Sequence, residues 1–291
     1  MAYPIVSAPY GFKPVSELGG LPYAGSTRMY PIATGYAANL FTGDLVQLSA
    51  GTVIKSAMSA ASSPGTAVDG TLGVFVGCEY TNPGTNQRIR AQYWPSGTVA
   101  QDAVAYVIDD PRTVFKVAVT TQGTSLANTG STVGYLSQTF VGTNVYAITG
   151  ATGSTVTGDS AMSVSGGVIS SGTSGNTRVA TALPFRVVQL VPDTAVSVAA
   201  TASTSGSSTT VTLTAANSAI QPGMQIIAPT GTGSLAGNYI AVTNVNGTTV
   251  TVASAITLAS GTAVTFIGYP EALVVWNSTF HSYTKIGRAH V

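Results

Sequence analysis

Charged side chains are scarce in this sequence. They make up 7% of its 291 residues, and the formal net charge is +1, whereas an ordinary soluble domain has about a quarter of its residues charged. Such a surface must meet water through Ser, Thr, Asn and Gly, a composition that we associate with proteins standing in water as assemblies outside cells. Because no run of Lys and Arg is present, we predict neither a nucleic-acid partner nor attraction to anionic lipid.

Cysteine and histidine are almost absent. Cys78 is the one cysteine, which excludes an internal disulfide and cysteine-based zinc sites, and its apolar surroundings predict a buried, inert thiol. Apart from His290, the one histidine is His281, which we expect on a terminal strand with one face in water. No G-x-S-x-G turn accompanies it, so the sequence does not predict a hydrolytic triad.

Paired carboxylates and phosphate-binding loops are missing as well. Asp109 and Asp110 are adjacent before Pro111, and neighbouring strand side chains point apart, so we interpret both as turn residues and not as an acid/base pair. The acids are scattered, and no glycine-rich loop leads from a strand into a helix. We therefore predict no metal, no cofactor and no enzyme activity; a distant pair such as Asp44 with Asp102 is the catalytic alternative.

Long apolar runs and amphipathic helices are also lacking. No run approaches the ~18 residues of a membrane span, and the N-terminus has neither the basic start nor the apolar core of a signal peptide. We expect no membrane partner.

Short alternating segments are what the sequence does contain. From residue 26 onward, stretches of about five to eight residues rich in Val, Ile, Thr and Tyr are separated by Gly, Pro, Asn or Asp. Turn residues at Gly43-Asp44 and Ala50-Gly51 predict hairpin corners. This spacing predicts an all-β protein whose host domain, residues 26–194 plus 269–284, is a β-barrel or β-sandwich.

One stretch differs from its surroundings. Residues 195–268 contain no Asp, Glu, Lys or Arg and alternate Thr and Ser with Val, Ile and Leu. Asn246-Gly247 predicts a two-residue hairpin turn within it. The host pattern stops before this stretch and resumes after it, so we predict a small β-sandwich inserted into the host domain.

The two ends of the chain need separate interpretations. Residues 1–25 are rich in proline and glycine and predict an extended arm. The arm either lies on a neighbouring subunit or wraps its own domain, and the candidate anchors are Tyr3, Tyr10, Phe12 and Tyr23. Residues 285–291 read KIGRAHV, which one frame of a common sequencing adapter would encode; we interpret them as an artefact that replaces the natural C-terminus.

Six stretches outside the insertion have characteristic sequences. They read APYGFKPV, YAGSTRMYPIATGYAANLFTGDLVQL, TLGVFVGCEYTNP, QYWPSGTVAQDAVAYVIDDPRTVFKV, LPFRVVQLVPDT and EALVVWNSTFHSY. Together they resemble a family of virion structural proteins of tailed phages. The motif GDLVQLSAGTVIKSA…LGVFVGC is similar to the small β-barrel of phage capsid decoration (cement) proteins. Residues 195–268 resemble the Ig-like or fibronectin-like modules of phage capsid and tail proteins.

This resemblance implies a function and partners. It implies a protein on the capsid surface of the virion that binds the major capsid protein, stabilises the head and forms a homotrimer. The insertion would project outward and touch host-surface glycans. The alternative is a tail, fibre or collar component whose insertion binds those glycans. The family offers no catalytic residues to carry over.

Overall fold

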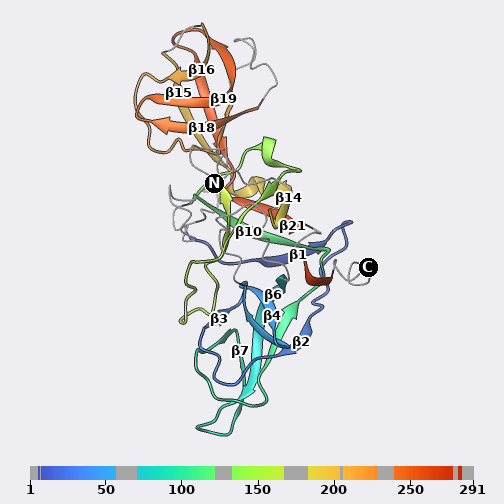
Figure 1. The fold of residues 1–291 in the computed structure, drawn as a ribbon. Helices are drawn as coiled ribbons and strands as arrows, with labels where there is room; N and C mark the ends of the chain where they lie inside the picture. The colour runs from blue at the N-terminus through green and yellow to red at the C-terminus, as the bar shows by residue number, and fades with distance from the viewer. Residues whose placement is uncertain are drawn as a thin grey trace.

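The structure is a computed structural model that describes residues 6, 8–56, 71–121, 133–166, 183–203, 206–227, 239–277 and 281–283. Strands dominate, joined by short 3-10 helices such as η1 (Gln138–Phe140) and η3 (Pro192–Thr194), so the predicted all-β class is confirmed. In the described ranges no helix has the length and apolar character needed to cross a membrane. Figure 1 shows an elongated molecule in which the three larger sheets follow one another along the long axis.

The first sheet is built from the N-terminal part of the host domain. Its strand order is β2-β9-β6-β4-β5, and β7 also pairs with the central strand β6. Ala50 and Gly51 form the predicted two-residue turn between β4 and β5, both with positive φ. The strands are β2 (Arg28–Pro31), β4 (Leu45–Ser49), β5 (Thr52–Lys55), β6 (Thr71–Thr81), β7 (Arg88–Ala91) and β9 (Val104–Ile108), with the separate pair β3 (Leu40–Phe41) and β8 (Tyr93–Trp94).

The second sheet contains the remaining host strands. Its order is β11-β14-β21-β10-β13-β12, and β1 pairs with β10. All its pairings are antiparallel except β10 with β13. The host range thus holds two larger sheets. Leu45, Val74 and Ile108 of the first sheet pack in the core cluster of the second, whereas the rest of the first sheet's core forms a cluster of its own. The strands are β1 (Lys13–Glu17), β10 (Thr113–Thr121), β11 (Asn144–Val145), β12 (Ala147–Ile148), β13 (Ser163–Gly166), β14 (Phe185–Leu190) and β21 (Glu271–Trp276).

The third sheet lies within residues 195–268, which we call the inserted module. Its six strands have the order β15-β20-β17-β18-β19-β16 and pair only with one another. A bridge between Ala202 and Leu213 brings the two outer strands together, so the sheet rolls into a nearly closed barrel around its own apolar core. The strands are β15 (Val196–Thr201), β16 (Gly206–Thr212), β17 (Gln225–Ile227), β18 (Ile240–Asn246), β19 (Thr249–Leu258) and β20 (Ala263–Gly268).

The predicted hairpin turn of the module is present, but one residue later than expected. Asn246 pairs with Thr249, so the loop consists of Gly247 and Thr248. Gly247 has a φ of 59°, and a positive φ at the first loop position is what glycine supplies most easily. Asn246 itself completes β18.

The inserted module is attached to the host by more than its two chain connections. Beside the second connection, Leu136 and Tyr269 of the host exchange two backbone hydrogen bonds of 3.0 Å. The backbone N–H of Gln138 donates to Oε1 of the buried Gln225, at 2.8 Å. Tyr135 also packs against the module core. These contacts hold the module in a defined direction at one end of the molecule, as Figure 1 shows.

Candidate interaction surface

Phe12, one of the four predicted interface anchors, belongs to the core of its own domain. Its side chain is 1% exposed, stacks on Phe185 with ring centroids 4.7 Å apart, and meets Phe115 edge-on at 6.3 Å. Such aromatic pairs stabilise a core beyond the area that they bury. Phe12 therefore fills the second sheet's core and presents no surface to a neighbour.

Tyr10 and Tyr23 are also tied to their own chain. The Tyr10 hydroxyl donates to Glu271, whose carboxylate is 3.3 Å from Lys116 Nζ. Burial and the Glu271 carboxylate raise the pKa of Tyr10. The Tyr23 hydroxyl donates to the carbonyl of Ser26 at 2.7 Å.

The two predicted readings of the N-terminal arm can now be compared for the described part. Residues 13–17 form β1, which pairs with β10 of the same chain. Residues 8–23 thus contact their own domain, as the second reading expects. Tyr3 and residues 285–291 lie outside the described residues.

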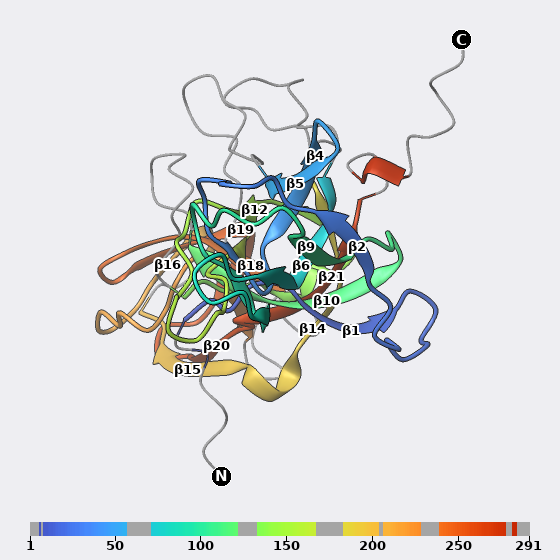
Figure 2. The same cartoon turned by 90° about the horizontal axis from the view of Figure 1, so that it is seen from below.

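A group of apolar side chains beside these anchors is exposed instead. Val15 and Leu18 are each 45% exposed and Leu21 is 63% exposed. A register shift between Pro14 and Ser16 leaves Val15 unpaired, and bulges of this kind turn a strand residue outward. We call residues 13–22 the apolar hairpin; Figure 2 shows the loop after β1 standing clear of the sheets.

The sequence predicted as anchors the aromatic residues that flank this hairpin, Tyr10, Phe12 and Tyr23, and not the aliphatic residues within it. The loop is closed by a hydrogen bond from the Glu17 N–H to the Leu21 carbonyl at 2.8 Å. Arg112 holds it against the body, since its Nη2 donates to the Leu18 carbonyl at 3.1 Å. Val15, Leu18 and Leu21 are three positions apart, with Gly19 and Gly20 between the last two, so no period-two alternation marked them in the sequence.

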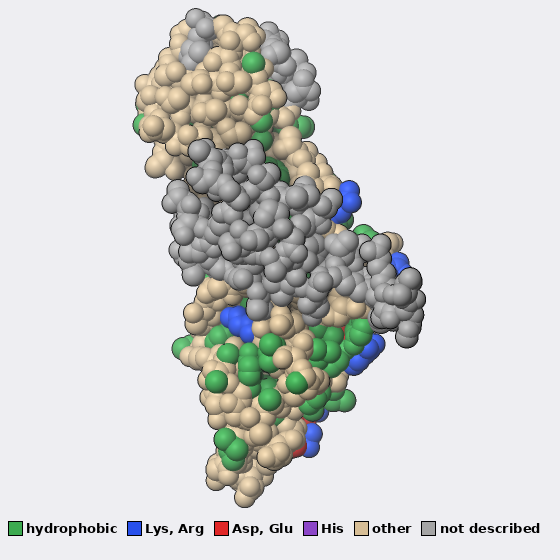
Figure 3. All heavy atoms as spheres, viewed as in Figure 1, with side chains coloured by type: hydrophobic (Ala, Val, Ile, Leu, Met, Phe, Trp, Pro, Cys, Tyr) green, Lys and Arg blue, Asp and Glu red, His purple; other side chains and the backbone are tan. Residues whose placement is uncertain are grey.

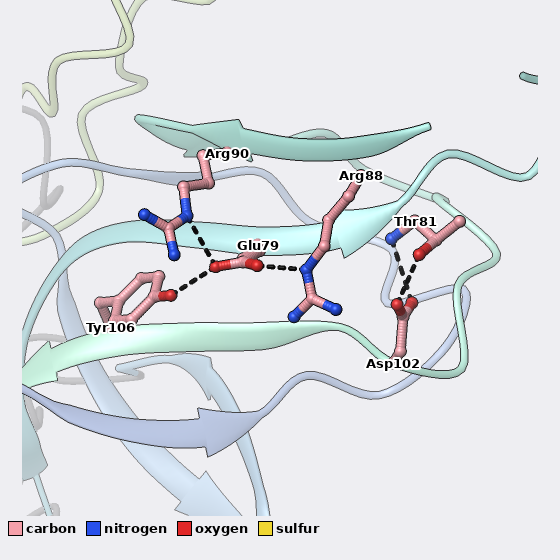
Figure 4. A network of polar contacts seen from close by, with 6 residues as sticks. All are labelled: Glu79, Thr81, Arg88, Arg90, Asp102 and Tyr106. Carbon is pink, nitrogen blue, oxygen red and sulfur yellow. Dashed lines mark hydrogen bonds and ion pairs between the residues drawn. The ribbon is translucent and has the colours of Figure 1, made fainter. Parts of the chain in front are cut away.

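A polar network joins β6, β7 and β9 of the first sheet. Glu79 on β6 is 5% exposed and receives hydrogen bonds from Arg90 Nε at 2.8 Å, from Tyr106 at 2.5 Å and from Arg88 Nε. The Tyr106 and arginine hydrogen bonds lower the pKa of Glu79 to about 2. Figure 4 shows Arg88 and Arg90 on either side of the carboxylate. Each of these three side chains thus finds its partner within the network. The contacts join β7 to β6 and β9, which is a structural role.

Asp44 and Asp102 likewise have separate hydrogen-bond partners. Asp44 is fully buried, accepts from Ser160 Oγ at 2.6 Å and from the Phe41 N–H at 3.0 Å, and has a pKa raised by desolvation. Asp102 accepts two bonds from Thr81 instead. The structure therefore does not bring Asp44 and Asp102 together as the catalytic alternative requires.

The adjacent acids Asp109 and Asp110 have different roles. Asp110 Oδ1 accepts from the Arg112 N–H at 2.8 Å, as expected of a turn residue. Asp109 instead joins a cluster with Arg28 Nη1 at 3.2 Å and the Tyr30 hydroxyl at 2.5 Å. This cluster connects β2 to the end of β9.

The predicted half-wet position of His281 is wrong. Its side chain is 0% exposed and lies edge-on to Trp276, with ring centroids 5.5 Å apart. Burial lowers its pKa. Cys78 is buried, as the sequence predicted, and desolvation raises the pKa of its thiol to about 12.

Across the described ranges, no group of three His, Cys, Asp or Glu residues is placed to hold a metal ion. In comparisons with protein-family models, with curated proteins and with solved structures, nothing matched this chain.

Proposed function

We propose that the chain is a structural protein of a tailed-phage virion that decorates the outer surface of the capsid. The observation that carries this proposal is the division of the surface. The host exposes the apolar hairpin, whereas the module, which has no charged residue, forms one end of the molecule. A decoration protein needs one face that buries apolar area on the head and another that remains in water without aggregating.

The character of the module surface supports an outward position. Figure 3 shows few hydrophobic side chains, and no Lys, Arg, Asp or Glu, on the face of the module in view. Its rolled sheet leaves little free edge, because Ala202 and Leu213 bridge the outer strands. A closed sheet resists edge-to-edge association between neighbouring copies.

The major capsid protein is the proposed partner, and a homotrimer the proposed form. Val15, Leu18 and Leu21 expose too little apolar area for a stable complex on their own, since specific interfaces bury about 1,200–2,000 Å². Three copies around a symmetry axis would present three hairpins together, and linked sites strengthen one another. Sedimentation analysis of the purified protein tests the trimer.

Cryo-electron microscopy of recombinant protein added to undecorated capsids of the source phage tests the function. We expect ordered density on the outer surface, with the apolar hairpin against the capsid and the module pointing away. Leu21→Asp should reduce occupancy strongly, because binding would desolvate a charge. The matched control is Val156→Asp, at a residue 93% exposed on another loop, which should bind normally.

Two outcomes would count against the proposal. Capsids that stay bare while the protein remains in solution would contradict it, as would equal binding by Leu21→Asp and the unchanged protein. Density on the tail, fibre or collar would support the second candidate function, recognition of host-surface glycans by the module at its free end.

A further inference from the structure

A hollow lies on the host beside the two chain connections to the inserted module. It has a volume of about 440 Å³ and is lined from η1, β14, η3 and the segment that follows β20. This size falls in the range of small-ligand sites, which is about 300–1,000 Å³. The lining residues are Gln138, Val141, Val188, Gln189, Leu190, Pro192 and Tyr269.

A β-bulge shapes this hollow. The pairing of β14 with β21 shifts between Val187 and Gln189, so Val188 is the extra residue. As a result Val188 and Gln189 are both exposed, although successive strand residues normally face opposite sides. Bulges often redirect a side chain toward a binding site. Here the bulge turns the Gln189 amide to the same side as the hollow.

The chemistry of the lining is polar but uncharged. Gln138 and Gln189 contribute amides, Tyr269 a hydroxyl and a ring, and no charged side chain lines the hollow. Within the described residues, none of these three side-chain polar groups has a hydrogen-bond partner. Leu190 and Val141 supply an apolar wall. Polar groups converging on an apolar wall are typical of ligand sites.

We propose that this hollow binds a short neutral oligosaccharide. An amide both donates and accepts, as vicinal sugar hydroxyls do, and an aromatic ring with aliphatic neighbours suits the apolar face of a pyranose. The missing charges disfavour acidic sugars and phosphates. Addition of a peptide strand at Val187 is blocked, because its N–H and carbonyl already bond Thr143 and Gly142. We call this hollow the junction groove.

Saturation-transfer NMR on the full chain tests the junction groove. The probes are maltotetraose, cellotetraose, isomaltotetraose and chitotetraose, with tetragalacturonate as the charged comparison. We expect transfer to at least one neutral probe, weakened about fivefold by Gln189→Ala through the loss of a hydrogen bond. Val188→Trp should abolish binding by filling the groove. Gln101→Ala, at an exposed residue of the first sheet's loops, is the matched control and should bind normally.

The proposal is overturned if no neutral probe binds at millimolar concentration or if Val188→Trp binds the probes as well as the unchanged protein. It is also overturned if tetragalacturonate binds as well as the neutral probes. Both test positions are exposed, and equal melting temperatures would show that the variants fold. The inference is independent of capsid decoration, because the sugar and the capsid are separate partners: loss of one activity leaves the other measurable.

Discussion

At the scale of single residues, Glu79 illustrates how this sparsely charged protein uses its charges. Three side chains donate to its carboxylate, and its pKa falls from the ordinary 4.5 to about 2. The folded protein thus keeps the carboxylate ionised where the unfolded chain would protonate it. The stability that this group contributes is complete above about pH 4.5 and is lost as the pH falls toward 2.

We therefore expect Glu79→Gln to change the pH dependence of stability. The difference in unfolding free energy between the unchanged protein and the variant should shrink as the pH falls from about 4.5 to about 2. Urea unfolding at a series of pH values measures it. Glu17→Gln, which has no side-chain partner in the described residues, is the control. A difference that stays constant with pH would contradict this role of Glu79.

At the scale of elements, two glycines allow the N-terminal segment to cross the turn before β4. Gly11 and Gly43 have φ values of 78° and 95°. A Cβ on Gly43 would lie 2.9 Å from the Phe12 nitrogen and 3.0 Å from the Gly11 Cα. The Phe12 N–H donates to the Gly43 carbonyl at 3.0 Å. This close approach of the two segments places the Phe12 side chain in the core.

Gly43→Ala should lower the unfolding free energy more than Gly35→Ala does, because it adds steric conflict to the backbone strain that both variants share. A side chain at positive φ costs about 1–3 kcal/mol, and the contacts with Phe12 and Gly11 should add about 1–3 kcal/mol as overpacking does. Gly35→Ala is the control, because Gly35 has a φ of 71° with open space around it. Thermal and urea unfolding compare the two. Equal losses of stability would show that the crossing has room for a side chain.

At the scale of the whole molecule, the inserted module has the anatomy of an independent unit. Its strands pair only with one another, and it has its own apolar core. Val196 and Gly268, at its two ends, pair directly across β15 and β20. Partners in an antiparallel pair have Cα atoms about 4.5–5.5 Å apart. The host chain could therefore be rejoined by a very short linker.

We expect two folded proteins from such a division. A host in which residues 195–268 are replaced by a short Gly-Ser linker should retain its strands, somewhat destabilised because Tyr135 loses its cover. Residues 195–268 expressed alone should fold as well. Dispersed amide NMR spectra and a cooperative melting transition for each piece measure this. Collapsed spectra for either piece would show that the junction contacts are essential for folding.

Much of the fold followed from local sequence. Short strands are present from residue 28 onward, and the charge-free stretch coincides with the third sheet. Ala50-Gly51 formed the expected turn. The candidate interaction surface was predicted less well than the fold. Phe12, a predicted anchor, is buried, and the exposed Leu18 and Leu21 were not among the predicted anchors. Exposure depends on which neighbours cover a side chain, and sequence spacing does not contain that information.

The sequence by itself determined the all-β class and the absence of charged residues from residues 195–268. Each of these depends on composition or on a period-two pattern, which short stretches of chain express locally. Tertiary structure alone decided how the host strands divide between two sheets, that His281 is buried, and where the hollow beside Gln189 lies. Such features join distant residues, as Tyr10 joins Glu271 across 261 positions, and only the packing of the sheets brings them together.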